Sequence, residues 1–210
     1  AAPDPPLVGE PRATAPTGAP AWALIAFAIG YNLTHHNSLG GEYEGPEGTQ
    51  VADWVDLATP FVVVLPLLGF LVGQRPRRTH QWVAAVGAIL YVEGHGIHLA
   101  ANSASHAGGA SPVGPIAGVA HFWDEVAGHY LWYLGLAIMV GACSLCVRGQ
   151  PLGLRRGPLL LGGAVCGLTW ATNGLEGGTA VFSLICAVGA VGLVDRERAG
   201  LSVALLAAST

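Results

Sequence analysis

Long apolar stretches separated by short polar segments make up most of this chain. A helix that crosses a bilayer needs about 20 mostly apolar residues, and six stretches come close to that length. They predict transmembrane helices over residues 20–37, 51–73, 81–103, 117–147, 157–174 and 178–195. The expected fold is therefore an all-α integral membrane protein, with six helices in a compact bundle.

The composition agrees with a membrane location. Of the 210 residues, 52% are hydrophobic and 10% are charged, whereas a soluble domain carries about 25% charged residues. The 31 glycines suit close packing of transmembrane helices, because small residues let helix backbones approach each other. Lysine is absent, which excludes a retinal Schiff base. The chain has no phosphate-binding or dinucleotide-binding motif, and nothing indicates a nucleic-acid partner.

The segments outside the predicted bundle are short. Residues 1–19 are rich in proline and alanine, a composition typical of a disordered tail. Residues 20–195 form the predicted six-helix transmembrane domain. Residues 196–210 are too short to span a bilayer and are expected to form a cytoplasmic tail or an interfacial helix.

All the arginines fall on one side of the predicted bundle. Cytoplasmic loops carry the excess of basic residues, so this side is predicted to be cytoplasmic, with both termini inside the cell. The protein is expected to lie in a cell membrane, namely a bacterial plasma membrane. The arginines are Arg12, Arg75, Arg77, Arg78, Arg148, Arg155, Arg156, Arg196 and Arg198.

Seven of the eight histidines fall at or near the outer ends of the predicted spans, and only His80 falls on the inner side. Residues three or four apart lie on the same face of a helix. His95, His98 and His106 therefore share one face near the outer end of the span 81–103. Ionisable groups inside a membrane are rare and are usually functional.

The next span offers a matching polar face. His121, Glu125 and His129 follow in steps of four, and Asp124 lies one position off that line. The short glycine- and proline-containing connection between the two spans is typical of adjacent antiparallel helices. The two polar faces are therefore expected to oppose each other at the same depth. His36, at the end of the first span, is expected to complete the cluster.

Histidines on facing helices with nearby carboxylates predict a metal site. Neutral imidazole suits zinc, copper and iron, and a carboxylate serves as a ligand or as a base. The preferred ligands are His98 and His129, and Asp124 and Glu125 are the candidate catalytic residues. The full set of candidate metal ligands is His36, His95, His98, His106, His121 and His129.

These residues favour a membrane metalloenzyme, a hydrolase or an oxidase, that acts on a lipid or another hydrophobic substrate from the outer side. Two alternatives remain open. The histidines would suit an electron-transfer subunit that binds haem or copper and works beside a partner subunit, or a metal-ion transporter. The simplest interpretation is structural: polar residues that satisfy one another and hold two helices in register.

Two other features bear on the site. Asp53 and Asp56 stand at the outer end of the span 51–73, where they are expected to line the mouth of the same cavity or to contact water. Pro60 and Pro66 in this span are expected to kink it and free backbone carbonyls. The four cysteines, Cys143, Cys146, Cys166 and Cys186, are predicted to be structural thiols.

Ser103 and His106 in one span, followed by Asp124 at the start of the next, resemble a pattern of the alkaline ceramidase and progestin-receptor-like membrane hydrolases. In that superfamily a serine, an aspartate and a late pair of histidines surround a zinc ion. The resemblance implies zinc-dependent hydrolysis. It covers only two of the six predicted helices, and no histidine follows His129.

Overall fold

The computed structural model describes residues 19–35, 45–74, 76–107, 114–147 and 156–193. These residues are helical apart from short connections, and none of them forms an extended strand. The two predicted tails lie outside the described residues, except for Ala19.

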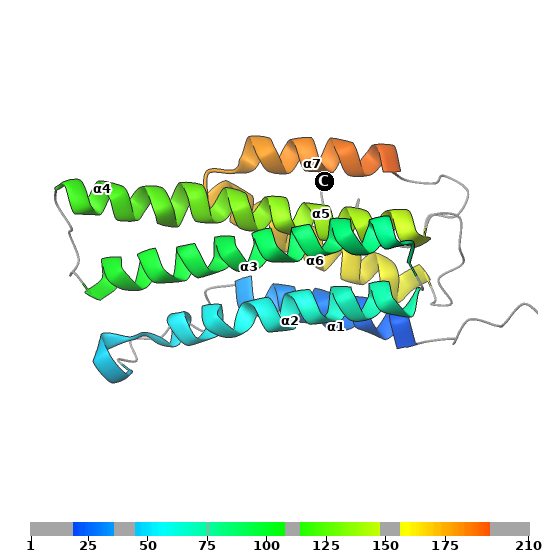
Figure 1. The fold of residues 1–210 in the computed structure, drawn as a ribbon, viewed down its shortest axis with the longest axis horizontal. Coiled ribbons are helices and arrows are strands. Elements are labelled where there is room, and N and C mark those ends of the chain that lie inside the picture. Colours follow the sequence, from blue (N-terminus) through cyan, green and yellow to red (C-terminus); the bar gives the residue numbers. More distant parts are fainter. Residues whose placement is uncertain (1–18, 36–44, 75, 108–113, 148–155, 194–210) are drawn as a thin grey trace, which may run out of the picture.

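The helices run side by side in a bundle (Figure 1). α3 lies between α2 and α5, α1 packs against α2 and α6, and α7 packs against α5 and α6. Elements α4, η3 and α5 follow one another without a break and form one long helix. The elements are α1 (Ala19–His35), η2 (Pro46–Gly48), α2 (Val51–Gly73), α3 (Arg78–Ala107), α4 (Pro115–His121), η3 (Phe122–Gly128), α5 (His129–Val147), α6 (Arg156–Glu176) and α7 (Ala180–Leu193).

Among the described residues, three helices are long and apolar enough to cross a membrane: Val51–Gly73, Arg78–Ser105 and Pro115–Cys146. Large apolar side chains point away from the bundle along these helices, including Phe61 and Trp82, which are 63% and 73% exposed. Such a surface is suited to lipid rather than to water. The helices lie where the apolar stretches predicted them. That six of them cross the membrane, and in which orientation, stays a prediction.

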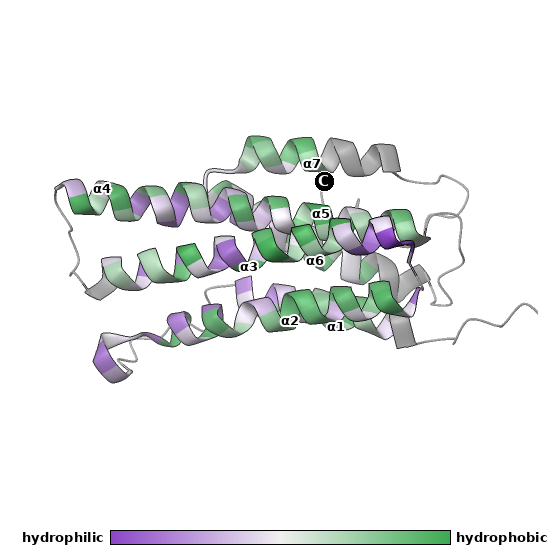
Figure 2. Cartoon of the chain, in the orientation of Figure 1, coloured by the Kyte–Doolittle hydropathy of each residue, from purple (hydrophilic) through white to green (hydrophobic). Residues whose placement is uncertain are grey.

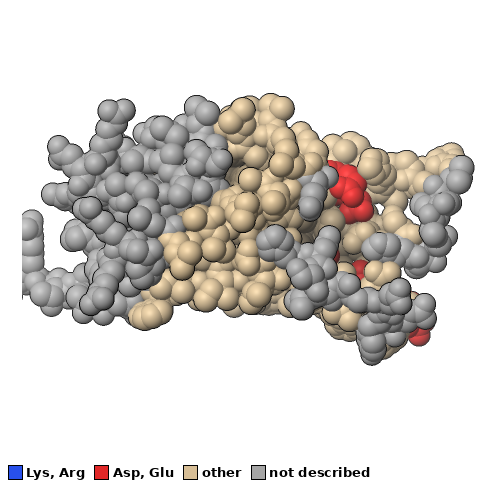
Figure 3. Space-filling model, turned by 180° about the vertical axis from the view of Figure 1, so that it is seen from behind, with Lys and Arg blue, Asp and Glu red and all other residues tan. Residues whose placement is uncertain are grey.

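The two ends of the bundle differ in the sign of their charged residues. Hydrophilic positions occur along the half of the bundle that carries η2 and α4, and a second group lies at the other end, where α3 begins (Figure 2). The acidic residues visible in Figure 3 lie toward this same end. Arg77 and Arg78 stand at the opposite end, where α3 begins. The carboxylates and these two arginines are therefore segregated along the long axis of the bundle.

Glycines bring the backbones of α3 and the α4–α5 helix into direct contact. A Cβ atom added at Gly87 would lie 2.8 Å from the carbonyl oxygen of Gly135, and one at Gly128 would lie 3.1 Å from that of Gly94. Each helix contributes two glycines seven residues apart, which places them on one face. This contact fixes the relative depth of the side chains that lie beside it.

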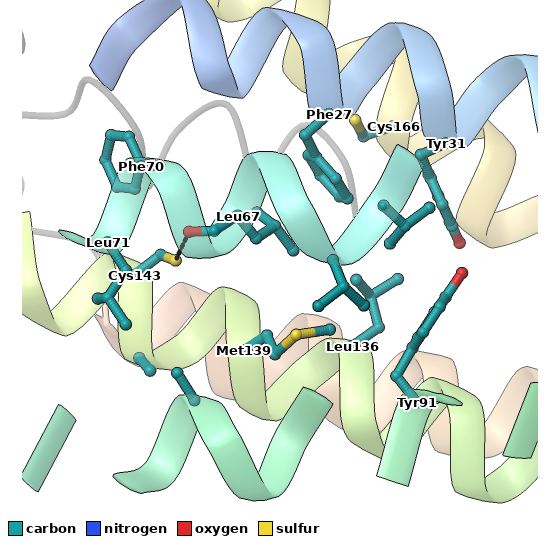
Figure 4. Close-up of a cluster of buried hydrophobic side chains, with 14 of the residues drawn as sticks. Phe27, Tyr31, Leu67, Phe70, Leu71, Tyr91, Leu136, Met139, Cys143 and Cys166 are labelled. Carbon is teal, nitrogen blue, oxygen red and sulfur yellow. Dashed lines mark hydrogen bonds between the residues drawn. The ribbon is translucent and has the colours of Figure 1, made fainter. Parts of the chain in front are cut away.

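A buried apolar cluster fills the middle of the bundle (Figure 4). Phe27 and Tyr31 of α1 meet Leu67 of α2 there, and Leu136 and Met139 approach from α5.

The cysteines add to this packing, in agreement with the prediction of structural thiols. Cys143 and Cys166 are buried, and none of the four cysteines forms a disulfide. The thiol of Cys143 donates a weak hydrogen bond to the carbonyl of Leu67, at 3.7 Å.

The prolines of α2 leave carbonyls without their usual helical donor. Pro66 has no N–H group to donate to the carbonyl of Val62, four residues earlier. Gly30 of α1 packs directly over this carbonyl, because a Cβ added at Gly30 would lie 2.9 Å from its oxygen. The carbonyl of Asp56 loses its donor at Pro60 in the same way.

Candidate functional site

His98 of α3 and Asp124 of η3 form the closest ion pair of the described residues. The Nδ1 atom of His98 lies 2.6 Å from an Oδ atom of Asp124, and the two side chains are only 14% and 10% exposed. The glycine contact between the helices explains this closeness, since a Cβ added at Gly128 would lie 3.1 Å from the Cβ of His98. The site therefore stands at the point where the two backbones touch.

The π-helical segment η3 turns Asp124 toward this site. A π-helical turn joins residues five apart, and Asp124 precedes His129 by five positions. Both residues are buried and both lie beside His98. An uninterrupted α-helix would instead align His121 with His129, as the sequence predicted. In the structure His121 is exposed, and Glu125 has a side chain that is 41% exposed.

His129 packs against His98 and is held by its own helix. The two imidazole rings have centroids 4.9 Å apart, so the predicted approach of these residues is seen in the structure. The Nδ1 atom of His129 lies 3.0 Å from the backbone carbonyl of Glu125, to which it donates. The turn between α6 and α7 lies over the ring, since a Cβ added at Gly177 would be 3.2 Å from Nε2.

Two more histidines extend the cluster toward α1. The ring centroid of His95 lies 6.2 Å from that of His98 and 5.8 Å from that of His35. His95 is only 2% exposed, and neither of its ring nitrogens has a hydrogen-bond partner among the described residues. His35 lies with its Nε2 atom 3.5 Å from the hydroxyl of Tyr91.

Trp132 of α5 stands at the centre of these rings. Its ring centroid lies within 5.5 Å of the centroids of all four imidazoles, and the residue is 4% exposed. The four histidines around Trp132, which we call the imidazole cluster, are His35, His95, His98 and His129.

The two aspartates of α2 have different surroundings. Asp53 accepts hydrogen bonds from the Ser103 hydroxyl at 2.6 Å and from the Gln50 backbone N–H at 2.7 Å. It thus caps α2 and links it to α3, which is a structural role. Asp56 lies 3.8 Å from the Nε2 atom of His98, on the side away from Asp124. His98 is therefore flanked by a carboxylate at each ring nitrogen.

The structure brings together only part of the predicted site. His95, His98, His129 and Asp124 meet, and the carboxylate of Glu125 lies 3.5 Å from Nδ1 of His129, whereas His121 is exposed. His36 lies outside the described residues, as does the side chain of His106.

Two residues at the centre of this region, Trp132 and His35, are not among the candidates predicted from the sequence. Trp132 follows His129 by three positions and so shares its face, which is the signal that the sequence offers for it. His35 is adjacent to the predicted ligand His36, and only one of two adjacent helical residues can face a site.

The donors do not form a complete metal site. Among the residues that the structure describes, no three histidine, cysteine, aspartate or glutamate side chains converge in a geometry that would hold a metal ion. The arrangement most similar to such a site is the pair His98 and His129, in which Asp56 and Asp124 lie beside His98.

An apolar groove reaches the imidazole cluster from the side of the bundle. It lies between α2 and α3 and has a volume of about 380 Å³. Leu57, Phe61 and Leu65 of α2 border it and are more than half exposed, so the groove opens where lipid would lie. His95 and Asp56 are its only polar side chains. The surface of the groove is nonetheless almost wholly apolar, because the ring nitrogens of His95 are buried behind it.

Comparison with known proteins does not extend this description. No protein-family model, no curated protein and no solved structure matches the chain.

Proposed function

We propose that this chain is a polytopic membrane enzyme that acts on a lipid or another hydrophobic molecule. The observation that carries the proposal is the position of His98. One of its ring nitrogens lies 2.6 Å from Asp124, and the other faces Asp56, which lines the groove. An imidazole oriented by a buried carboxylate is the usual arrangement of a general base.

The proposal includes a transition metal, zinc, copper or iron, with His98 and His129 as two of its ligands. Histidine ligands almost always direct their second ring nitrogen to a carboxylate or a backbone carbonyl. His98 meets Asp124 in this way, and His129 meets the Glu125 carbonyl. The metal would supply an activated water or a redox centre. The chain's own part is to orient the two imidazoles and to keep the centre away from bulk water.

Metal analysis and lipid profiling of the purified protein test this function together. We expect bound metal in the wild-type protein and its loss in His98→Ala and His129→Ala. The matched control is His80→Ala, because His80 lies 18 residues before His98 on α3, a distance of about 27 Å along a helix. Incubation with a membrane lipid extract should change one class of lipid with wild type and with the control, but not with His98→Ala.

The outcomes separate the two parts of the proposal. Lipid turnover without bound metal would reject the metal and keep His98 as a base. If no lipid changes with the wild-type protein, whether metal is added or removed, the enzymatic function is refuted.

The haem alternative receives less support from the geometry. The rings of His98 and His129 lie 4.9 Å apart and both touch Trp132. A porphyrin placed between them as axial ligands would require the two helices to separate, although their glycines hold the backbones in contact.

We propose further that the bundle has six spans, with both termini in the cytoplasm and the imidazole cluster toward the outer side. The arginine distribution supports this orientation. In a variant without native cysteines, Glu44→Cys and Ser111→Cys should react with a membrane-impermeant maleimide on intact cells. Gly153→Cys, in the predicted inner loop, should react only after the cells are opened. Labelling in the reverse order would refute the orientation.

A further inference from the structure

We propose that a divalent transition-metal ion binds between the Nε2 atom of His98 on α3 and the carboxylate of Asp56 on α2. Asp124 orients the imidazole from its other side, and water completes the coordination of the ion. This inference depends on the proposed function, because it adds Asp56, which the sequence did not single out as a ligand, to the metal of the same site.

The separation of the two side chains fits a shared ion better than a direct contact. The Nε2 atom of His98 lies 3.8 Å from an Oδ atom of Asp56, which is too long for a hydrogen bond. Nitrogen and oxygen ligands lie about 2.0–2.2 Å from a zinc ion, so two ligands at a tetrahedral or wider angle stand roughly 3.3–4.2 Å apart. The observed distance falls within this range.

The second ring nitrogen of His98 has the partner that metal-bound histidines usually have. Its Nδ1 atom lies 2.6 Å from an Oδ atom of Asp124, a residue that is 7% exposed. A carboxylate in this place fixes the orientation of the ring and leaves the lone pair of Nε2 for a metal. Carboxylate, imidazole, ion and carboxylate would therefore follow one another from η3 through α3 to α2.

The negative charges around His98 exceed the positive charge that the imidazole can carry. The side chains of Asp56 and Asp124 are 18% and 10% exposed, and among the described residues each forms an ion pair with His98 alone. The chain has no lysine, and Arg78 precedes His98 by 20 residues on α3, about 30 Å along a helix. Buried charges are costly unless they are paired or bind a metal. A divalent ion would balance both carboxylates.

Asp56→Asn tests the ligand with little change in the shape of the side chain, because it removes the charge and keeps the size. The matched control is Asp53→Asn, three positions earlier on α2. Asp53 accepts hydrogen bonds from Ser103 and from the Gln50 backbone, and the amide oxygen of the variant can still accept. The control therefore removes the same charge at the same end of α2 without touching His98.

Titration of the metal-free, full-length protein in detergent with zinc, followed by calorimetry, measures binding without any turnover. We expect one zinc ion per chain in the wild-type protein. The dissociation constant should rise about 100-fold in Asp56→Asn and in His98→Gln, and about tenfold in Asp124→Asn, since residues that orient a metal ligand contribute about 10–100-fold to affinity and ligands at least as much. It should stay the same in Asp53→Asn.

Asp56→Cys gives a direct spectroscopic readout of ligation. Zinc is colourless because its d shell is full, so Co²⁺ takes its place in this experiment. In a variant without native cysteines, Co²⁺ added to Asp56→Cys should produce the intense near-ultraviolet charge-transfer band of a cobalt–thiolate bond. Leu57→Cys is the control, because Leu57 is the next residue on α2 and is 52% exposed. It should give no such band.

Equal zinc affinity in wild type and Asp56→Asn, or an equally strong cobalt band in Leu57→Cys, would overturn the proposal. A wild-type protein that binds no zinc would overturn it as well. Loss of binding in His98→Gln but not in Asp56→Asn would reject Asp56 and keep the metal of the proposed function. Zinc binding that requires Asp56, in a protein that changes no lipid, would keep the metal site and refute the enzymatic function.

Discussion

Gly94→Ala is expected to destabilise the folded protein by about 3 kcal/mol, at the upper end of the range for overpacking a buried site. The added Cβ would meet the backbone nitrogen of Trp132, and it would lie 2.7 Å from the Gly128 carbonyl oxygen and 2.9 Å from the Leu131 Cβ. None of these atoms is the end of a flexible side chain. The two helices must therefore separate, and unfolding in detergent micelles would measure the loss.

Gly96→Ala is the control for this prediction. It lies two positions further along α3, where an added Cβ meets no atom within 4 Å. Replacing a mid-helix glycine with alanine stabilises a helix by up to about 1 kcal/mol, so the two variants should shift the unfolding transition in opposite directions. Equal effects at both positions would show that the two backbones are not in contact at Gly94.

Asp124→Ala is expected to destabilise the protein by about 3 kcal/mol, because it leaves a buried His98 nitrogen without its carboxylate. His98 and Asp124 approach to 2.6 Å, and Nδ1 of His98 has no hydrogen bond to any other group among the described residues. The double variant His98→Phe with Asp124→Ala should cost less than the sum of the single variants. Chemical unfolding of the four proteins measures this coupling.

Glu125→Ala provides the neighbouring control. The Glu125 carboxylate lies 3.5 Å from Nδ1 of His129, but this side chain is 41% exposed, so the pair contributes little. The backbone carbonyl of Glu125, which also holds His129, is kept by the substitution. We expect a change within about 0.5 kcal/mol, as for most surface substitutions. If Asp124→Ala were equally mild, or if the effects of His98→Phe and Asp124→Ala were additive, the ion pair would contribute nothing to the fold.

The positions of the helices could be predicted from the sequence because apolar runs of sufficient length are a strong local signal. The run 51–73 corresponds to α2 (Val51–Gly73), and the run 157–174 to α6 (Arg156–Glu176). The number of helices that cross the bilayer is harder to predict. Among the described residues, three helices are long and apolar enough to cross a membrane. The prediction of the other three spans depends on the arginine pattern.

The meeting of His98 and His129 could be predicted from helical periodicity and the short connection between their spans. The role of Asp124 could not, because it depends on the π-helical turn of η3. One extra residue in a turn shifts which side chains share a face, and a regular 3.6-residue period misplaces them. The same shift turns His121 outward, although its spacing of eight from His129 predicted a common face.

Which of His35 and His36 faces the bundle depends on how α1 is rotated about its own axis. Adjacent residues on a helix differ by about 100° in direction, so only one of them can face the bundle. The rotation of α1 is set by its packing on α2 and α6, which sequence alone does not give. In the structure His35 contacts Tyr31, His95 and Trp132.

The glycine contact between α3 and α5 has a consequence for motion. Two helices with touching backbones move as one rigid body, since any sliding or rotation would drive Gly94 and Gly135 into the opposite main chain. α2 is the more deformable partner of the groove, because Pro60 and Pro66 each remove one of its internal hydrogen bonds. Exchange of a molecule with the bilayer would then proceed by bending of α2 against a fixed α3–α5 pair, with the imidazole cluster unmoved.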